Sequence, residues 1–359
     1  MLTFHPLELT RRRPIAEDAM CLELRPQPSL REAFRFEAGQ HLPVRAAIGG
    51  RELRRTYSII SAAGGSLRIG VRVQGEMSRY LASGLRIGGF LDAMEPTGRF
   101  RPTLDPTRAK SYLALAAGSG ITPVLSIVAT ILAAEPASRV VLCYANRSAA
   151  RTMFLDELLG LKDRHIERLV VHFLMSREPQ DVEMFNGRLD APKLRALAAG
   201  EFDPRTFDEF FVCGPGSMVR DLSSTLKELG AGGKIHIERF SVDASAAAGA
   251  APPGARAASG TPVATTAETE VAVSMDGRRR SFRMSRGERI LDAAEAAGLS
   301  LPFSCRSGVC STCRAKLVDG TVAMDRNQAL EEWEVRAGFV LCCQARPTSP
   351  RIEISYDEK

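Results

Sequence analysis

Four cysteines near the C-terminal end follow the order C-x4-C-x2-C-x29-C, which constrains this chain more than any other feature. The small residues Ser307, Gly308 and Ser311 lie between them, so the backbone can curl closely around a metal centre and point N–H groups at the sulfurs. The spacing predicts a [2Fe–2S] cluster held by four thiolates, whereas a zinc ribbon usually has two short C-x2-C pairs. The predicted ligands are Cys305, Cys310, Cys313 and Cys343.

The residues after about Glu268 resemble plant-type ferredoxins, which implies an α+β, β-grasp-like domain over residues 268–359. The fourth ligand is open to two interpretations because Cys342 and Cys343 are adjacent. Matching residues 340–345 to the corresponding segment of that family selects Cys343. The match leaves Cys342 where the family usually has Ser or Thr, so we predict Cys343 as the ligand.

The length and the cysteine usage favour a multidomain protein of the cytoplasm. A chain of 359 residues is too long for one ordinary core. Cys21, Cys143 and Cys213 are scattered, so they form no disulfide framework and fit a reducing compartment, and the N-terminus shows no secretory signal. The net charge is +6, but no arginine run is interleaved with aromatic residues, so we expect no nucleic-acid partner.

One stretch, residues 111–134, carries no charge and is long enough to cross a bilayer. The sequence GSGITP interrupts it at residues 118–123. A buried strand, a glycine turn and a helix opened by Pro123 explain the stretch better than a membrane span does. We therefore expect no association with a membrane.

The chain is predicted to contain three domains and one linker. Residues 1–105 have short alternating runs separated by glycines, which favours an antiparallel β-barrel. Residues 106–240 alternate strand-like and helix-like segments, as is typical of a doubly wound α/β nucleotide-binding domain. Residues 241–267 are rich in Ala, Gly, Pro, Ser and Thr and are predicted to form a flexible linker before the ferredoxin-like domain.

The sequence RRTYS at residues 54–58 resembles the flavin-binding signature of the ferredoxin–NADP reductase superfamily. The resemblance implies that Arg55 grips a flavin pyrophosphate, that Tyr57 packs on the flavin ring and that Ser58 places a hydroxyl near its N5. A predicted helix start offers a second phosphate site. The residues predicted to contribute there are Gly75, Met77 and Ser78. Two shorter segments match loops of the same family, at residues 39–40 and 95–100.

The sequence GSGITP at residues 118–123 follows a predicted strand and opens a helix, so its backbone can approach the phosphates of a dinucleotide. About 95 residues later, CGPGSM at residues 213–218 resembles the loop that places a cysteine beside a nicotinamide. This order of motifs indicates a pyridine-nucleotide site. The predicted contact residues are Gly118, Gly120, Thr122, Pro123, Cys213, Gly214, Pro215 and Met218.

Asn146 and Arg147 end the second predicted strand of the nucleotide domain, where the adenosine ribose is usually recognised. Arginine rather than an acidic residue favours the 2′-phosphate of NADPH, although NADH stays possible and a solvated arginine is the alternative interpretation. Glu238 and Phe240 match the terminal E-x-F of the family. Phe240 is expected either to lie near the flavin edge or to cap the last strand.

As a whole, the chain resembles ferredoxin–NADP reductase relatives that carry a C-terminal ferredoxin, and it is similar to the reductase subunits of ring-1,2-phenylacetyl-CoA epoxidases. The resemblance implies FAD, NADPH and a di-iron oxygenase partner, with hydride transfer beside Ser58 and Cys213 and single electrons leaving through the cluster. The alternatives are a reductase for a Rieske-type or steroid hydroxylase and, more remotely, a non-catalytic iron–sulfur redox sensor. The matching segments lie at residues 4–7, 35–41, 52–59, 116–123, 235–240 and 322–324.

Overall fold

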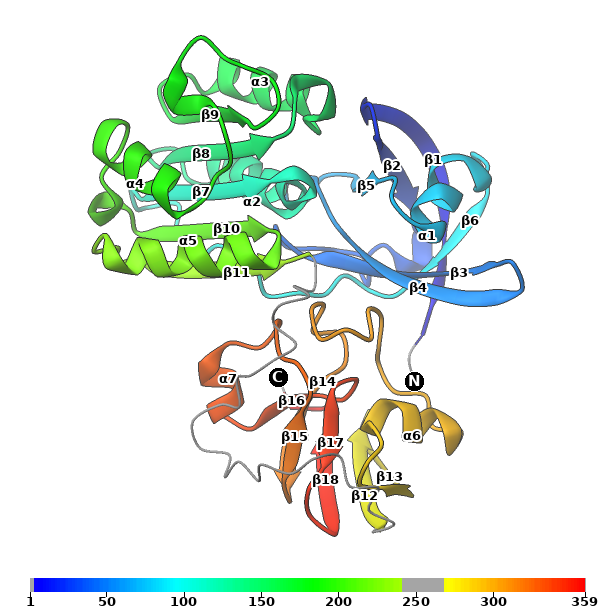
Figure 1. Ribbon diagram of the computed structural model, residues 1–359. Coiled ribbons are helices and arrows are strands. Elements are labelled where there is room, and N and C mark those ends of the chain that lie inside the picture. Colours follow the sequence, from blue (N-terminus) through cyan, green and yellow to red (C-terminus); the bar gives the residue numbers. More distant parts are fainter. Residues whose placement is uncertain (1–2, 241–267, 359) are drawn as a thin grey trace. The chain divides into compact units, whose positions relative to one another are not determined.

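The computed structural model of the chain describes residues 3–240 and 268–358 (Figure 1). The chain divides into two compact units, of which one holds Phe4–Ser241 and the other holds Met1–Thr3 and Val242–Lys359. The predicted linker at residues 241–267 lies outside the described residues. The predicted boundary near residue 105 falls inside the first unit and stays a prediction.

The first part of the unit Phe4–Ser241 is an antiparallel sheet with the strand order β4-β3-β6-β1-β2-β5. A bridge between Ile59 and Ile69 joins the chain after β4 to β5, so the two ends of the sheet approach each other and the predicted barrel closes. Leu22, Leu42 and Ile69 are fully buried inside it. The elements are β1 (His5–Ala16), β2 (Ala19–Arg25), β3 (His41–Ile48), β4 (Arg51–Ser58), β5 (Leu67–Arg72), α1 (Glu76–Arg79) and β6 (Phe90–Ala93).

The second part of this unit is a parallel sheet with the order β11-β10-β7-β8-β9. The central strand β7 reads SYLALAA, an almost continuous apolar run, because both of its faces are covered. Helices α2 and α3 pack on one face and helices α4 and α5 on the other, which confirms the doubly wound prediction. The elements are β7 (Ser111–Ala117), α2 (Ile121–Ala134), β8 (Arg139–Asn146), α3 (Leu155–Arg164), β9 (Leu169–Met175), α4 (Ala191–Gly200), β10 (Glu209–Gly214), α5 (Gly216–Glu228) and β11 (Lys234–Arg239).

Helix α2 begins two residues earlier than we predicted, at Ile121, directly after a 3-10 turn formed by Gly118–Gly120. Pro123 is therefore inside the first turn rather than at its opening. It breaks no hydrogen bond there, because the first N–H groups of a helix have no partner within the helix. Among the residues that the structure describes, no helix is long and apolar enough to span a membrane.

The second unit has a mixed sheet with the order β13-β12-β18-β14-β16, in which β12 and β18 are parallel and the other neighbours antiparallel. Strands β15 and β17 form a small separate sheet. Helix α6 buries Ile290, Leu291 and Ala294 in the core, so the unit is α+β as predicted. The elements are β12 (Glu268–Met275), β13 (Arg278–Ser285), α6 (Ile290–Ala296), β14 (Arg314–Asp319), β15 (Val322–Met324), α7 (Glu332–Arg336), β16 (Phe339–Leu341), β17 (Ala345–Pro347) and β18 (Arg351–Ser355).

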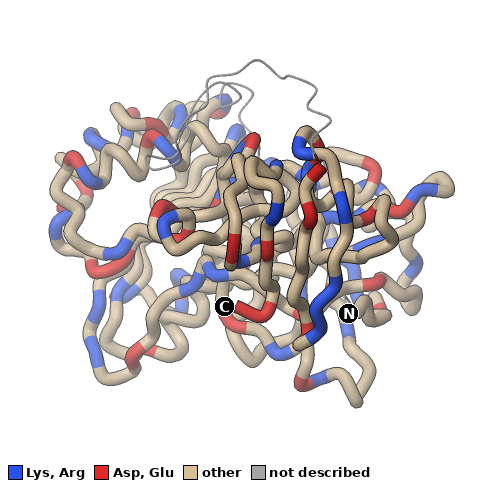
Figure 2. Tube along the Cα trace, turned by 90° about the horizontal axis from the view of Figure 1, so that it is seen from below, with Lys and Arg blue, Asp and Glu red and all other residues tan. Residues whose placement is uncertain are grey.

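Lys and Arg are interspersed with Asp and Glu along most of the described trace, as Figure 2 shows. An exception is the run of three arginines at residues 278–280, which opens β13. Strand β13 is an edge strand that pairs with β12. Positive charges on an edge strand discourage pairing with another chain, so this run has a structural explanation.

Candidate functional site

Strand β4 presents the predicted flavin residues at its end. Arg55 and Tyr57 share one face, because side chains two residues apart in a strand point the same way. Burial raises the pKa of Tyr57, so its phenol stays protonated. Ser58 is the last residue of β4 and is buried beside its register partner His41 on β3.

Three segments that match the flavin family, although far apart in sequence, meet around His41. The N–H of His41 donates to the Thr97 carbonyl at 2.8 Å, and the N–H of Ile59 donates to the Gln40 carbonyl at 2.9 Å. Gly98 has φ +126°, and a Cβ there would lie 3.0 Å from His41 Nδ1. His41 Nε2 is buried with no hydrogen-bond partner among the described residues. Buried polar atoms are normally paired, so this orphan nitrogen fits a site that a bound flavin completes.

The turn before α1 is held by Ser78. Its Oγ accepts the N–H groups of Gln74 and Gly75, at 2.9 and 2.8 Å, and donates to the Gly75 carbonyl at 2.9 Å. The Met77 side chain packs in the barrel core with 2% of its surface exposed. Both side chains are thus occupied by the fold, and only the backbone of this turn is left to contact a phosphate.

The glycine loop and the cysteine loop lie directly against each other, because β7 and β10 are neighbours with Ala116 paired to Cys213. A Cβ at Gly120 would lie 2.3 Å from the Cys213 carbonyl oxygen, so the close approach requires glycine. A Cβ at Gly214 would lie 2.6 Å from Met218 Cε. The structure therefore brings the two predicted nucleotide motifs together at the carboxyl ends of the strands, where α/β sheets bind ligands.

Glu238 connects the cysteine loop with the flavin side. It is the register partner of Cys213, whose Sγ donates to Glu238 Oε2 at 4.0 Å, and its other oxygen lies 3.8 Å from His41 Nδ1. Burial, reinforced by the Glu238 charge, raises the pKa of Cys213, so the thiol stays protonated and does not act as a thiolate nucleophile. Phe240 is 38% exposed and donates its N–H to the Gly214 carbonyl at 3.2 Å. The arrangement suits the orientation of a flavin ring and a nicotinamide ring toward each other rather than covalent catalysis.

Asn146 is buried at the end of β8, and Arg147 beyond it is exposed. The Arg147 carbonyl accepts the N–H of Arg177, which follows β9, so a second arginine lies beside the first. The sequence analysis missed Arg177, although a basic residue just past the next parallel strand is a usable signal. Glu178 Oε2 accepts the Ala149 N–H at 2.9 Å, so a carboxylate also lies at this loop.

The predicted cluster cysteines form two thiol pairs. The N–H of Ser307 donates to Cys305 Sγ at 3.4 Å, and the N–H of Cys305 donates to Cys310 Sγ at 3.5 Å. The Cys310 thiol and Ser307 lower the pKa of Cys305, and the Cys313 thiol lowers that of Cys343. Within residues 3–240 and 268–358, no three His, Cys, Asp or Glu side chains form a site for a single metal ion. Two thiol pairs with N–H donors instead fit a cluster of two irons, with Cys305 and Cys310 on one iron and Cys313 and Cys343 on the other.

The adjacent residues Cys342 and Cys343 have different surroundings in the structure. Cys342 is fully buried, and burial raises its pKa to about 12, with the Tyr356 hydroxyl as its main polar neighbour. Cys343 instead pairs with another predicted ligand, and Gln344 Nε2 lies 3.6 Å from its Sγ. The same amide donates to the Arg306 carbonyl at 2.9 Å, which joins the Cys343 segment to the main cysteine loop. These contacts favour Cys343.

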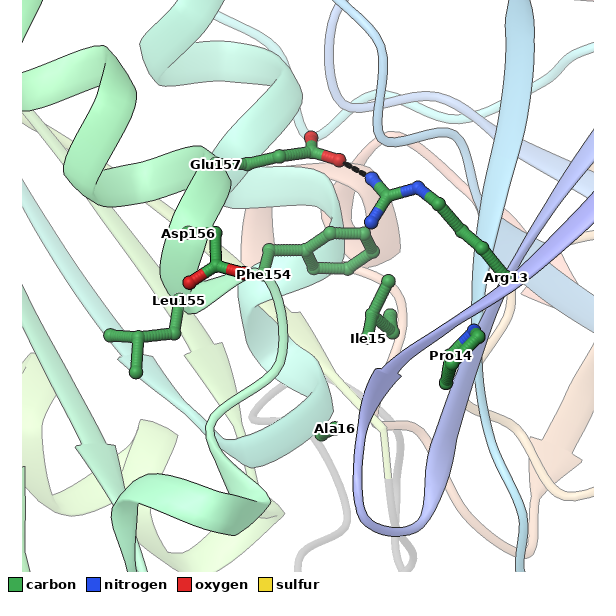
Figure 3. Close-up of a pocket in the computed structure, with 8 residues that line it drawn as sticks. All are labelled: Arg13, Pro14, Ile15, Ala16, Phe154, Leu155, Asp156 and Glu157. Carbon is green, nitrogen blue, oxygen red and sulfur yellow. Dashed lines mark hydrogen bonds and ion pairs between the residues drawn. The ribbon is translucent and has the colours of Figure 1, made fainter.

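A cavity of about 200 Å³ lies between the end of β1 and the start of α3 (Figure 3). Arg13 from β1 and Glu157 from α3 form an ion pair beside it. None of its lining residues is among the predicted cofactor residues. The candidate site is therefore built at strand ends and loops rather than in this cavity.

Comparisons with known proteins identify three cofactor-binding domains in the chain. Three family profiles match: an oxidoreductase FAD-binding domain at residues 6–101, an oxidoreductase NAD-binding domain at residues 114–224 and a 2Fe-2S iron-sulfur cluster binding domain at residues 273–348. The solved structure of phthalate dioxygenase reductase shares the fold, with a TM-score of 0.57 and 24% identity, and the match covers 98% of both chains.

Two curated relatives match over most of the chain. One subunit of the 1,2-phenylacetyl-CoA epoxidase from Escherichia coli is 40% identical over 100% of this chain and 99% of that protein. The ferredoxin reductase component of 3-ketosteroid-9-alpha-monooxygenase from Mycobacterium tuberculosis is 34% identical over 90% of this chain and 86% of that protein. The chain therefore belongs to the ferredoxin–NADP reductase superfamily, among the members with a C-terminal ferredoxin domain, and is an NAD(P)H oxidoreductase that passes electrons through FAD and a [2Fe–2S] cluster to an oxygenase.

Proposed function

We propose that this reductase delivers electrons to the di-iron oxygenase component of a phenylacetyl-CoA epoxidase. The observation that carries the proposal is the 40% identity to a protein of the Escherichia coli epoxidase, which runs from end to end of both chains. The match to the steroid monooxygenase reductase is weaker, at 34% over 90% of the chain. The relative with the higher identity and the fuller coverage is the better guide to the shared partner.

Within the chain, we assign the flavin to the face of β4 that carries Arg55 and Tyr57, next to Ser58. The nicotinamide is assigned to the loop of Cys213, beside Glu238 and the exposed ring of Phe240. FAD accepts a hydride and releases electrons singly, which is chemistry that the cofactor supplies when bound. The side chains orient the two rings and exclude water, and no covalent step on the protein is needed.

We assign the cluster to Cys305, Cys310, Cys313 and Cys343. The support is the pairing of these thiols and the N–H groups directed at the sulfurs of Cys305 and Cys310. Hydrogen bonds to ligand sulfurs tune the potential of iron–sulfur clusters, so this loop is suited to accept electrons from the flavin.

NADPH is the proposed donor. Arg147 is exposed and has no ion-pair partner in the described part of the chain, and Arg177 lies beside it. Two guanidinium groups favour a 2′-phosphate, because arginine binds phosphate with a fork of charged donors. The Glu178 carboxylate at the same loop acts against this preference.

A steroid hydroxylase is the second candidate partner, because four relatives named as 3-ketosteroid-9-alpha-monooxygenase reductase components match 90% or 91% of the chain. The two candidates differ only in the acceptor. Reconstitution distinguishes them: the purified reductase is mixed with the oxygenase subunits of the Escherichia coli epoxidase or with a 3-ketosteroid monooxygenase, and NADPH-dependent product is quantified. We expect epoxide formation with the first oxygenase. Steroid hydroxylation without epoxide formation contradicts the proposal, and cytochrome c reduction verifies that the reductase is intact in both mixtures.

A further inference from the structure

We propose that Ser126 is a positioning residue for hydride transfer, because it fastens the helix that follows the dinucleotide loop to the flavin barrel. It acts together with Thr122 and Thr130 of the same helix. The inference rests on electron transfer from a nicotinamide to the flavin and not on the identity of the oxygenase.

The three residues form a stripe of side chains on α2, which we call the hydroxyl seam. Thr122, Ser126 and Thr130 are spaced four residues apart, so they lie on one face of the helix. They are the polar residues of an otherwise apolar helix, yet their exposed fractions are 2%, 0% and 5%. Hydroxyls buried this deeply need partners, so the elements that they contact define what the seam does.

Each residue of the seam contacts the part of the unit that precedes β7. Ser126 Oγ donates to the Ser61 carbonyl at 2.5 Å and accepts the N–H of Gly39 at 3.4 Å. Thr130 Oγ1 accepts the N–H of Ala63 at 3.0 Å. Two turns of α2 are therefore bonded to the loop after β4 and to the turn before β3.

Thr122 makes the third contact by packing. Its hydroxyl donates to the Ser119 carbonyl at 2.9 Å inside the glycine loop, which leaves its methyl group to face the barrel. A Cβ at Gly70 of β5 would lie 2.6 Å from that methyl carbon and 3.0 Å from the Phe154 ring. The absence of a side chain at Gly70 is thus what lets the first turn of α2 approach the barrel so closely.

The hydroxyl seam joins the flavin part of the candidate site to the nucleotide part. Gly39, bonded to Ser126, precedes Gln40, whose carbonyl accepts the N–H of Ile59 directly after Ser58. At its other end, α2 begins at the loop Gly118–Gly120, which packs on the cysteine loop. Ser126 lies six residues after Gly120, about 9 Å along the helix, so its bonds act within about two turns of the dinucleotide loop.

Ser126 matters because hydride transfer depends on the distance between the nicotinamide and the flavin. Hydride transfer needs the reacting atoms about 3–3.5 Å apart, and a misplacement of 1 Å can lower the rate on the order of 100-fold. A helix that carries the dinucleotide loop and is bonded to the flavin segment sets that distance. A purely structural role for Ser126 predicts lower stability without a selective effect on this step.

The test uses the full chain with its cofactors and three variants. Ser126→Ala removes the two hydrogen bonds of the serine hydroxyl to the barrel segments. Thr130→Val removes the bond from the Ala63 N–H and the bond within the helix to the Ser126 carbonyl, while keeping the side-chain shape. Ser223→Ala on α5 is the matched control, because Ser223 Oγ donates to the Val219 carbonyl within its own helix at 2.6 Å and takes no part in the site. Anaerobic rapid mixing gives the rate of flavin reduction at saturating NADPH. The same protein is also reduced by light and then mixed with cytochrome c. This second assay gives the rate of electron transfer to cytochrome c, a step that does not involve the nicotinamide.

We expect Ser126→Ala to slow flavin reduction by roughly tenfold or more, with a smaller loss in Thr130→Val and none in Ser223→Ala. Electron transfer after photoreduction should stay within about twofold of the wild type in every variant. Unchanged flavin reduction in folded Ser126→Ala overturns the proposal, and so does an equal loss in both assays. If Ser126→Ala does not fold, Thr130→Val decides by the same two rates. The oxygenase is absent from both assays, so none of these results bears on the identity of the partner.

Discussion

Replacement of Gly120 by alanine should separate the two loops that form the nucleotide site. The added Cβ would lie 2.3 Å from the oxygen and 2.6 Å from the carbon of the Cys213 carbonyl, and 2.9 Å from the nitrogen of Gly214. Ordinary contacts begin at 3.4 Å, so the two backbones must part by about 1.1 Å. Gly120 has φ −60°, so the cost is steric and not conformational. Overpacking of this kind costs about 1–3 kcal/mol in the free energy of unfolding.

The kinetic effect should exceed the effect on stability. A separation of about 1 Å next to Cys213 is expected to slow flavin reduction by NADPH on the order of 100-fold. Rapid mixing measures this rate, and thermal unfolding should show a lower melting temperature, by about 2–4 °C for each kcal/mol. The control is Gly232→Ala, because a Cβ at Gly232 has no atom within 4 Å. A Gly120→Ala protein that reduces its flavin as fast as Gly232→Ala refutes the steric reasoning.

Three further predictions test other parts of the account. Cys310→Ala should leave flavin reduction by NADPH intact but abolish cytochrome c reduction, and equal cytochrome c rates in variant and wild type contradict the proposed route. Arg147→Glu should raise the KM for NADPH more than that for NADH, and an unchanged ratio in steady-state assays removes the coenzyme argument. Burial raises the pKa of Asp18, but hydrogen bonds from Arg151 and the charge of Arg72 outweigh it and lower the pKa below 3.8. The stability that Asp18 contributes is therefore present above that value and is lost as the pH falls through the lower folded pKa. Urea unfolding should show that the stability difference between the wild type and Asp18→Asn shrinks below about pH 4. A stability difference that is independent of pH counts against this interpretation.

The parallel sheet was predictable because its strands carry a strong local signal. Strands β7 and β10 are almost entirely apolar, and each ends in a glycine motif whose spacing matches a known family. Gly120 and Gly214 could be identified because each lies in a glycine motif directly after a strand-like segment, although the close contact between Gly120 and Cys213 appears only in the structure. Patterns of this kind depend on neighbours in sequence, which is why they can be read without a structure.

Other features depend on contacts between distant segments. The pairing of Glu238 with His41 joins β11 to β3, and no local pattern of either strand indicates it. Ser78 and Met77 matched a cofactor motif, but the fold uses their side chains for a turn and for the core. The proposed role of Ser126 was hidden for the same reason, because the four-residue spacing of Thr122, Ser126 and Thr130 places them on one helix face but does not indicate their partners.

An anaerobic titration with NADPH tests the central claim most directly. The purified protein is followed by absorbance for the flavin and by electron paramagnetic resonance for the cluster. The account predicts that NADPH bleaches the flavin and that the signal of a reduced [2Fe–2S] cluster then develops in the wild type but not in Cys310→Ala. A flavin that is reduced while the intact cluster of the wild type stays oxidised, even with excess NADPH, contradicts the proposed path of the electrons.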